Sequence, residues 1–458
     1  RGGPDHGRHR RAGARGHGPG ALHHRPGHGR RCETVITWQA PPVRYGLHAT
    51  EEIGHEIRQL GARSVLIVTD PNLARLELPQ RVRALVEQEG VETAVFDGAE
   101  VEPTDRGCEE AAASLGTREF DCYIGLGGGS SMDTAKMINL LRSCPGSGLR
   151  RYLNRPIGDG APVPRPLKPL ITVPTTAGSG SECTCMVALG VVSERVKTGI
   201  SDPRLRPTAA VVDPWNTVTM PPAVTAASGY DVLTHACESY TTRPYDRRPP
   251  YASPGVRPVY VGANPISDVW SEQALTLVGR YLRRAVLNPY DIEARAGMSR
   301  AALFAGMGFG NAGTHIPHAC AYPIAGLVTD YRPRDYRVDH PLVPHGESVV
   351  VTAPEAFAFT YATSPERHLR AAELLGASLD GTTVRNGADL LPQTLLDIVA
   401  DTGGPRGLSD FGYTARDIPA LTEGAARQER LLACCPRDVD RSHLSGILAR
   451  SLDHGTAA

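Results

Sequence analysis

Lysine is almost absent from this 458-residue sequence. Only Lys136, Lys168 and Lys197 occur among its 49 basic residues, and arginine supplies the rest. The 49 acidic residues bring the net charge to zero, whereas a surface that binds nucleic acid or anionic lipid needs an excess of positive charge. The composition therefore argues against both kinds of partner. The preference for Arg, Ala and Gly is typical of a GC-rich bacterial genome.

Features of exported and membrane proteins are missing as well. No apolar run approaches the ~20 residues that a membrane helix requires. The ten cysteines are scattered without a CxxC pair, and a chain of this length needs no disulfide framework. We therefore expect reduced thiols and no membrane segment, in the cytoplasm of a bacterium or in the mitochondrion if the host is a eukaryote.

Residues 1–32 contain scarcely any apolar side chains. Gly, Arg, His, Pro and Ala make up nearly all of them, so this segment cannot bury enough surface to offset its chain entropy. It lacks the apolar stretch of a secretory signal, and its arginines only weakly resemble a transit peptide. We predict a disordered, low-complexity tail, or a start that was assigned wrongly.

Residues 33–213 alternate between helical and strand patterns. Thr50 is placed to cap a helix in which Ile53, Ile57 and Leu60 fall on one face. Apolar runs rich in β-forming residues follow at 64–70, 93–98, 121–129, 170–174 and 209–214. Strands separated by helices of this length predict an α/β dinucleotide-binding domain whose mainly parallel sheet is covered on both faces.

Long helical patterns dominate after residue 213. They cover 223–240, 267–287, 291–309, 366–376 and 385–401. A stretch rich in Pro and Arg, 241–266, interrupts them and predicts a long irregular loop. We therefore expect residues 214–458 to form an all-α domain.

A glycine-rich turn is expected where the strand at 121–129 meets a helix. In GLGGGSSMDTAK (125–136), Gly127, Gly128 and Gly129 allow the backbone to come close to an anion. The helix N-terminus behind them offers free N–H groups and a partial positive charge, which suits a pyrophosphate. The spacing differs from GxGxxG, and the alternative is a tight strand–helix turn without a ligand.

Further polar residues complete the predicted nucleotide site. The loop PTTAGSGSE (174–182) brings hydroxyls that can bind phosphate or ribose, unless it is an ordinary loop. Asp70 ends a strand and can accept from a ribose hydroxyl, which favours NAD over NADP; the alternative is an Asp that begins a turn before Pro71. The predicted set beyond the three glycines is Asp70, Ser130, Asp133, Thr175, Thr176, Ser179, Ser181 and Lys197.

Asp231 and His235 lie four positions apart in DVLTHACESY, a stretch with a helical pattern. Helix geometry places them on one face, either as two ligands of a metal or as a solvated or capping pair. His315 and His318 follow in GTHIPHACAYP, and His345 in LVPHGES. A single buried His is usually a structural residue, but several beside an Asp-x-x-x-His favour a metal site.

Five motifs occur in an order that resembles the iron-containing (group III) alcohol dehydrogenases. They are GGGSSMDTAK, PTTAGSGSE, DVLTHACESY, HACAYP and VPHG, and the resemblance extends over about residues 36–455. The insertion at 241–266 and DYRVDHPLVPHG (335–346) are most similar to the hydroxyacid-oxoacid transhydrogenase branch of that family. The resemblance implies a dehydroquinate-synthase-like architecture, with an N-terminal dinucleotide-binding domain and a C-terminal metal-binding domain.

The resemblance also implies roles for single residues. The family's four ligands of a divalent metal match Asp231, His235, His318 and His345. Iron is the family's metal, although zinc suits the same ligands. The family has a further His, four residues after the third ligand, that helps to move the alcohol proton, and this chain has Tyr322 there. His315 is then either a substitute in that proton relay or a donor that orients a ligand.

The function implied by the resemblance is hydride transfer between two organic acids. A transhydrogenase of this branch moves hydride from a hydroxyacid such as 4-hydroxybutyrate to the oxoacid 2-oxoglutarate, through an NAD(H) that it keeps bound. Both substrates carry carboxylates, so the pocket needs a cation. Arg332, Arg334 and Arg337, just before His345, are predicted to supply it, and the alternative is a solvated basic loop.

Other functions remain open from the sequence alone. An NAD-dependent, iron-containing alcohol dehydrogenase would release free NADH. A dehydroquinate-synthase-like lyase would need many Lys and Arg residues for a phosphorylated sugar acid, and three lysines argue against it. A non-catalytic metal-binding protein would not need two nucleotide loops. A homodimer is the assembly that we consider, and the sequence does not determine it.

Overall fold

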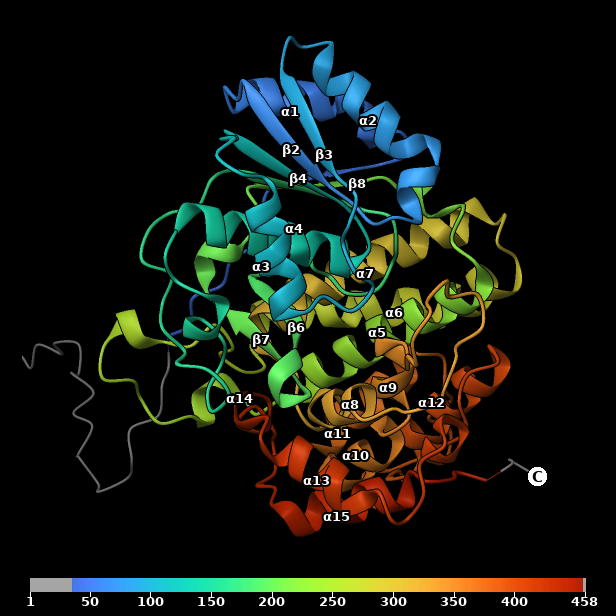
Figure 1. Ribbon diagram of the computed structural model, residues 1–458. Helices are drawn as coiled ribbons and strands as arrows, with labels where there is room; N and C mark the ends of the chain where they lie inside the picture. The colour runs from blue at the N-terminus through green and yellow to red at the C-terminus, as the bar shows by residue number, and fades with distance from the viewer. Residues whose placement is uncertain (1–34, 456–458) are drawn as a thin grey trace, which may run out of the picture.

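A computed structural model describes residues 35–455 of the chain (Figure 1). The predicted tail, 1–32, lies outside the described residues. Two parts are visible, an α/β part at the top of Figure 1 and a helical part below it. The predicted fold class is therefore confirmed, whereas the proposed division near residue 214 stays a prediction.

Six strands form one parallel sheet in the order β1-β8-β5-β4-β2-β3. Their bounds are β1 (Val43–Tyr45), β2 (Ser64–Val68), β3 (Glu92–Phe96), β4 (Cys122–Gly127), β5 (Leu170–Pro174) and β8 (Ala209–Val212). The five predicted strands are all present. The prediction missed β1, because its three residues are too few to show a pattern.

Helices cover both faces of this sheet, as the sequence predicts. They are α1 (Ile53–Gln59), α2 (Glu77–Glu87), α3 (Asp105–Ser114) and α4 (Gly129–Ser143). Alternate residues of β2 face opposite ways. Val65 and Ile67 pack with α1 and α2, while Leu66 and Val68 pack with α3 and α4.

The predicted helix cap at Thr50 is wrong. A 3-10 turn, Ala49–Glu52, precedes α1, and it starts after His48 rather than Thr50. Thr50 is buried instead, and its N–H donates to Asp213 while its hydroxyl accepts from Asn216. The residue therefore ties the start of α1 to the end of β8.

An antiparallel hairpin, β6 (Met186–Val191) and β7 (Val196–Ser201), was not predicted. The residues of β6 alternate regularly between half-buried and buried positions, but its sequence, MVALGV, has no polar residue, which hides the strand period. The hairpin packs against α4 and against helix α8 (Ile316–Gly326) of the helical part. It thus forms a wall between the two parts of the molecule.

The helical part is built around α5, α6 and α7, which pack against one another. Its helices besides α8 are α5 (Pro222–Thr241), α6 (Pro265–Leu287), α7 (Ile292–Ala312), α9 (His345–Val350), α10 (Ala353–Thr360), α11 (Pro365–Leu374), α12 (Leu390–Asp401), α13 (Ile418–Ala426), α14 (Glu429–Leu432) and α15 (Arg441–Arg450). The five predicted helices are present with small shifts at their ends. The stretch 241–266 is irregular apart from two 3-10 turns, as predicted.

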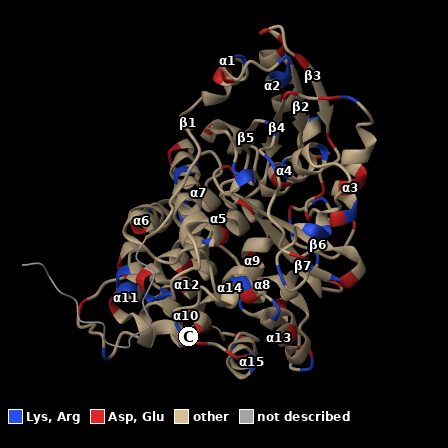
Figure 2. Ribbon diagram, turned by 90° about the vertical axis from the view of Figure 1, so that its left-hand side faces the viewer, with Lys and Arg blue, Asp and Glu red and all other residues tan. Residues whose placement is uncertain are grey.

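Surface and core properties agree with the composition. Basic and acidic residues are interspersed along the ribbon in both parts of the molecule (Figure 2). The nine cysteines of the described residues are free and buried. Within residues 35–455, no helix combines the length and the apolar character needed to cross a bilayer.

Candidate metal and nucleotide site

One face of α5 carries three ionisable side chains in the helical part. Asp231, His235 and Glu238 are spaced by four and three positions, so they stack along one side of the helix. All three are buried, because α6, α7 and α9 pack around α5. Burial of two carboxylates beside imidazoles is costly unless the groups are paired or bind a cation.

Asp231 is the centre of a cluster of imidazoles. Its Oδ1 lies 3.3 Å from His235 Nδ1, 3.5 Å from His318 Nε2 and 3.9 Å from His345 Nε2. Donor atoms of Asp231, His318 and His345 all lie within 4.8 Å of one another, as the ligands of one ion must. His235 falls outside that group, although its ring stacks on His318 at 4.4 Å between centroids.

Several donor atoms in this cluster have no partner in the described protein. Asp231 Oδ1, His235 Nδ1 and His318 Nε2 are buried and make no hydrogen bond. Buried polar atoms are rarely left without a partner, and such atoms call for an explanation. Burial also holds the pKa of His235 and His345 well below the usual value, which keeps their lone pairs available. The residues present therefore fit a divalent metal.

Glu238 orients one imidazole of the cluster. Its Oε2 lies in close contact with His318 Nδ1, and its Oε1 accepts from the backbone N–H of His315 at 2.7 Å. The N-terminus of α8 is thereby fixed on α5, with His318 Nε2 turned toward Asp231. Burial acts to lower the pKa of His318, but the carboxylates of Glu238 and Asp231 outweigh it and raise the pKa to about 9.

A glycine allows α9 to approach α5. A Cβ added to Gly346 would lie 1.8 Å from the carbonyl oxygen of Ala227 and 3.0 Å from the backbone nitrogen of Asp231. Any side chain there would push the two helices apart. Since His345 begins α9, this close approach places its ring beside Asp231.

The two residues predicted for the proton relay lie in different surroundings. The ring of Tyr322 is 6.3 Å from the ring of His345, on the side of the metal cluster. The ring of His315 is fully buried, with Nε2 3.2 Å from the hydroxyl of Thr241 and an edge contact to Phe357. Burial lowers the pKa of His315 to about 4. This placement favours a structural role for His315.

The two glycine-rich loops follow neighbouring strands, β4 and β5, and touch each other. Thr175 N–H donates to the carbonyl of Gly127 at 2.9 Å. A Cβ on Gly129 would lie 2.6 Å from Ser179 Oγ, whereas a Cβ on Gly128 would meet only Thr176 at 3.5 Å. The start of α4 therefore lies open beside the hydroxyls of the second loop, as a phosphate site requires.

Three other predicted cofactor residues, Ser130, Asp133 and Ser181, already bind within the protein. Asp133 accepts from Ser181 Oγ at 2.5 Å and from the backbone N–H of Ala188 at 2.9 Å. Lys136 donates to Ser181 Oγ at 2.7 Å and completes this buried network. Ser130 donates to the carbonyl of Val101. These bonds give the residues a structural role that needs no nucleotide.

Asp70 forms the turn that the sequence analysis gave as the alternative to ribose binding. Its Oδ1 accepts from the backbone N–H groups of Asn72 and Leu73, both at 3.0 Å, as in a turn. Its Oδ2 lies 3.5 Å from Ser131 Oγ and faces the loop after β4. β2 and β4 are the neighbours between which the chain order reverses, and open α/β sheets bind ligands at this point.

A cavity of about 920 Å³ lies between the two parts of the molecule. The segments after β2 and β3, the hairpin and the loop 337–342 line it. Lys197 is in this wall and pairs with Glu102. Of the three arginines predicted to bind substrate, Arg337 lines the cavity, whereas Arg332 and Arg334 do not.

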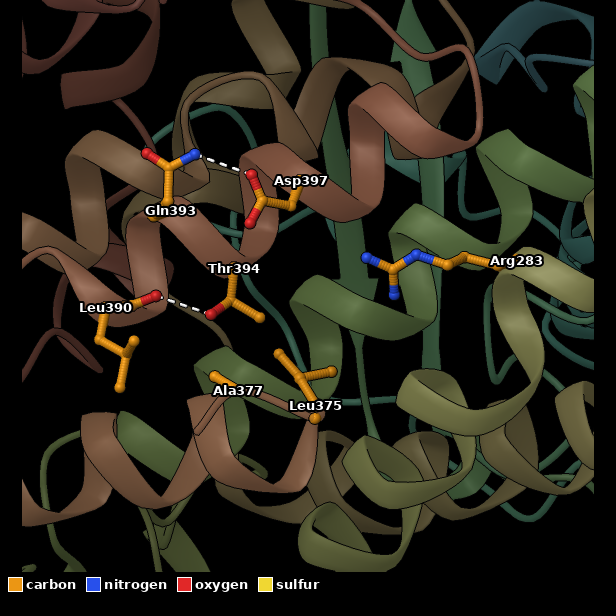
Figure 3. A pocket seen from close by; sticks show the side chains of 8 residues that line it. Arg283, Leu375, Ala377, Leu390, Gln393, Thr394 and Asp397 are labelled. Atoms are coloured by element: carbon orange, nitrogen blue, oxygen red, sulfur yellow. Dashed lines mark hydrogen bonds between the residues drawn. The ribbon is translucent and has the colours of Figure 1, made fainter. Parts of the chain in front are cut away.

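A smaller cavity of about 210 Å³ lies elsewhere in the helical part (Figure 3). Its polar groups are largely bonded to each other or to the backbone: Gln393 donates to Asp397, and the Thr394 hydroxyl donates to the carbonyl of Leu390. Arg283 points toward it but pairs with Asp401. Because these polar groups already have partners within the protein, we do not regard this cavity as a functional site.

Comparison with known families agrees with this geometry. The family model for iron-containing alcohol dehydrogenase matches residues 40–214, and the C-terminal model of the same family matches residues 259–452. The chain belongs to the iron-containing alcohol dehydrogenase family. The resemblance stated from the motifs, and with it the class of enzyme, is confirmed.

Members of the family resemble the chain over most of its length. Mitochondrial hydroxyacid-oxoacid transhydrogenase from Xenopus tropicalis is 46% identical, over 93% of this chain and 92% of that protein. The human protein of the same name is 47% identical, over 89% and 88%. Among solved structures, a 1,3-propanediol oxidoreductase matches with a TM-score of 0.79 and 28% identity, over 91% and 100%.

A further solved structure contains a nucleotide. Sulfoacetaldehyde reductase from Bifidobacterium kashiwanohense in complex with NAD+ has a TM-score of 0.75 and 25% identity, over 93% of this chain and 100% of that one. Both parts of the fold are therefore shared with these two solved structures.

Glu238 is the site residue that the sequence interpretation missed. It lies three residues after His235 in DVLTHACESY, on the face that carries the two predicted ligands. That helical spacing was the available signal. The partner on α8 could not be inferred, because it depends on how two separate helices pack.

Replacing Glu238 by Gln should weaken metal binding. The variant keeps the shape of the side chain but loses the charge that holds His318, so we expect metal affinity to fall by about 10–100-fold. Competition titration with a chromophoric chelator measures this. The control is Glu272→Gln. It removes a carboxylate of α6 that accepts a hydrogen bond from Tyr240, which lies on α5 as Glu238 does. Equal metal affinities for both variants would contradict the role assigned to Glu238.

Gly346→Ala should separate α9 from α5. We expect the free energy of unfolding to fall by about 1–3 kcal/mol, as for other overpacked contacts, with a loss of metal affinity as His345 moves. Urea denaturation with and without metal tests this. In Gly326→Ala the new Cβ would lie 3.8 Å from its nearest neighbour, so that variant should be unchanged. A Gly346→Ala protein of normal stability would refute the packing argument.

Gly128→Ala should separate ligand binding from stability. The new Cβ has room within the protein, so unfolding by urea should be unaffected. It would occupy the space through which a pyrophosphate approaches α4, and we expect the dissociation constant of NADH to rise about tenfold or more. Fluorescence titration of NADH measures this. Unchanged NADH affinity would place the nucleotide elsewhere.

Proposed function

We propose that this chain is a hydroxyacid-oxoacid transhydrogenase. It would move hydride from a 4-hydroxybutyrate-like hydroxyacid to 2-oxoglutarate, giving succinic semialdehyde and 2-hydroxyglutarate. The observation that carries the proposal is the Asp231–imidazole cluster, whose His345 lies within electrostatic reach of Lys197 in the wall of the cleft. Identity of 46% and 47% to proteins that bear this name supports the choice of substrates.

The residues that we propose to hold the metal are Asp231, His235, His318 and His345. When bound, the ion would act as a Lewis acid toward the hydroxyl or carbonyl oxygen of the substrate. We propose iron from the family, and zinc suits the same donors. The part of the chain is to keep His235 and His345 neutral through burial and to hold His318 through Glu238.

The dinucleotide is proposed to lie across the carboxyl ends of β4 and β5. The start of α4 would bind its pyrophosphate. The residues Thr175, Thr176 and Ser179 belong to the loop after β5, which touches the start of α4, and their hydroxyls would bind the cofactor as well. The complex of the sulfoacetaldehyde reductase with NAD+ supports NAD(H) as the cofactor. The large cleft would enclose its nicotinamide end, with Lys197 in the wall. Retention of NADH between half-reactions distinguishes this function from that of a simple dehydrogenase.

Proton movement is proposed to involve Tyr322 rather than His315. Tyr322 lies beside His345, whereas the ring of His315 faces Thr241 and Phe357. For location, the relatives named above are mitochondrial by name. We propose the mitochondrion for a eukaryotic host and the cytoplasm for a bacterial one, and a homodimer as the assembly.

An assay without added nucleotide tests the proposed function. Metal-loaded protein, kept anaerobic, is mixed with 4-hydroxybutyrate and 2-oxoglutarate. We expect succinic semialdehyde and 2-hydroxyglutarate to form in equal amounts over many turnovers, because the bound cofactor is regenerated in each cycle.

Two controls define the contrary result. The first omits 2-oxoglutarate and should give at most one equivalent of product per site. The second supplies 1-butanol with excess free NAD+. Steady release of NADH in the second control, with no coupled product formation in the main assay, would show an ordinary alcohol dehydrogenase instead.

A further inference from the structure

Arg430 of α14 is a half-buried cation that forms no ion pair with a carboxylate among residues 35–455. Its Nη1 atom is shielded from solvent and makes no hydrogen bond among residues 35–455. Its electrostatic partners are Tyr260, which also hydrogen-bonds to the guanidinium, Tyr322 and Cys434, and none of them is a carboxylate. Arginine stays charged at any pH at which the protein is folded, so it cannot avoid this cost by losing its proton. A guanidinium N–H that is shielded from water and has no partner therefore indicates an anionic ligand.

The surroundings of Arg430 connect it with the metal cluster. The guanidinium lies over the ring of Tyr260, 4.7 Å from the centroid. Tyr260 packs in one cluster with Tyr322 of α8. Tyr322 in turn lies beside His345, with 6.3 Å between ring centroids. Arg430 thus stands one aromatic layer away from the proposed metal ligands.

The position of Tyr260 is fixed by a second arginine. Arg248 donates to the carbonyl of Tyr260 at 2.8 Å and to Cys434 Sγ at 3.3 Å. Both Tyr260 and Arg248 come from the irregular stretch 241–266. The conformation of this stretch therefore holds the ring of Tyr260 against Arg430, near the proposed metal site.

We propose that Arg430 binds the substrate carboxylate remote from the reacting carbon, with Tyr260 and Tyr322 forming the walls of this subsite. The inference rests on the proposed function and specifies its substrates as ω-carboxylated hydroxyacids and oxoacids. A carboxylate would satisfy the free Nη1 with a charge-assisted hydrogen bond. A neutral alcohol would leave the guanidinium unpaired, so discrimination arises from the site itself.

Arg337 is the competing candidate for the same role. It lines the large cleft, but it is exposed there, and a solvated guanidinium needs no ligand. Arg430 differs because water does not reach its Nη1. The two assignments make opposite predictions for single variants.

Steady-state kinetics on the metal-loaded protein tests the proposal. Arg430→Gln should raise KM for 4-hydroxybutyrate by about 30-fold or more, while KM for 1-butanol changes by less than about threefold. Arg430→Lys should restore part of the affinity, because it returns a positive charge. The matched control is Arg427→Gln, which lies three residues before Arg430 and loses an ion pair with Glu194. This variant should resemble the wild type. A selective KM effect in Arg337→Gln, and none in Arg430→Gln, would overturn the proposal.

A binding measurement without turnover separates this inference from the proposed function. Glutarate, which carries carboxylates but no hydroxyl or keto group, should raise the Tm of the metal-loaded wild-type protein by several degrees at saturation. In Arg430→Met the Tm without glutarate should be at least that of the wild type, since a shielded guanidinium N–H without a partner is removed, and glutarate should have no effect. Equal glutarate shifts in both proteins would refute the subsite.

The combined outcomes are distinct. If the wild type binds glutarate through Arg430 but couples no hydride transfer, the proposed reaction fails while the carboxylate subsite stands. If hydride transfer occurs and Arg430→Gln keeps the wild-type KM for 4-hydroxybutyrate, the subsite fails while the reaction stands.

Discussion

The bond between Glu238 and His318 is the interaction on which the candidate site depends. Glu238 is completely buried in α5, and it binds both the backbone at the start of α8 and the imidazole of His318. Two helices that are far apart in the sequence are thereby fixed at one point. Because His318 is held through Nδ1, its other nitrogen is turned toward Asp231, and the remaining imidazoles gather around that carboxylate.

The rest of the fold brings two further functions to this point. The parallel sheet ends where β4 and β5 carry their glycine-rich loops, and the hairpin leads from that edge to the helical part. Lys197 of the hairpin is close enough to lower the pKa of His345, after the larger effect of burial. Since Lys197 also lines the cleft, the cleft reaches the neighbourhood of the proposed metal site. Arg430 and Tyr260 add the means to choose acids over neutral alcohols.

Features with a local period could be predicted from the sequence, whereas contacts between distant segments could not. The buried strands of the sheet and the pair Asp231 and His235 follow from spacing within one element. Glu238 lay in the same motif, yet its meaning depends on α8. Arg430 had no signal, because its free Nη1 is apparent only when α14 packs against α8. The prediction that Thr50 caps α1 failed because the backbone N–H of Thr50 donates to Asp213, a residue that is distant in the sequence.

The coordination of the metal tests the central claim most directly. X-ray absorption at the iron edge, on protein reconstituted anaerobically with one equivalent of Fe(II), reports the ligand atoms. We expect a carboxylate oxygen and imidazole nitrogens, with one imidazole fewer in each of the variants His235→Ala, His318→Ala and His345→Ala. A spectrum with oxygen ligands alone, or one that none of these substitutions changes, would show that the ion binds elsewhere and would contradict the account.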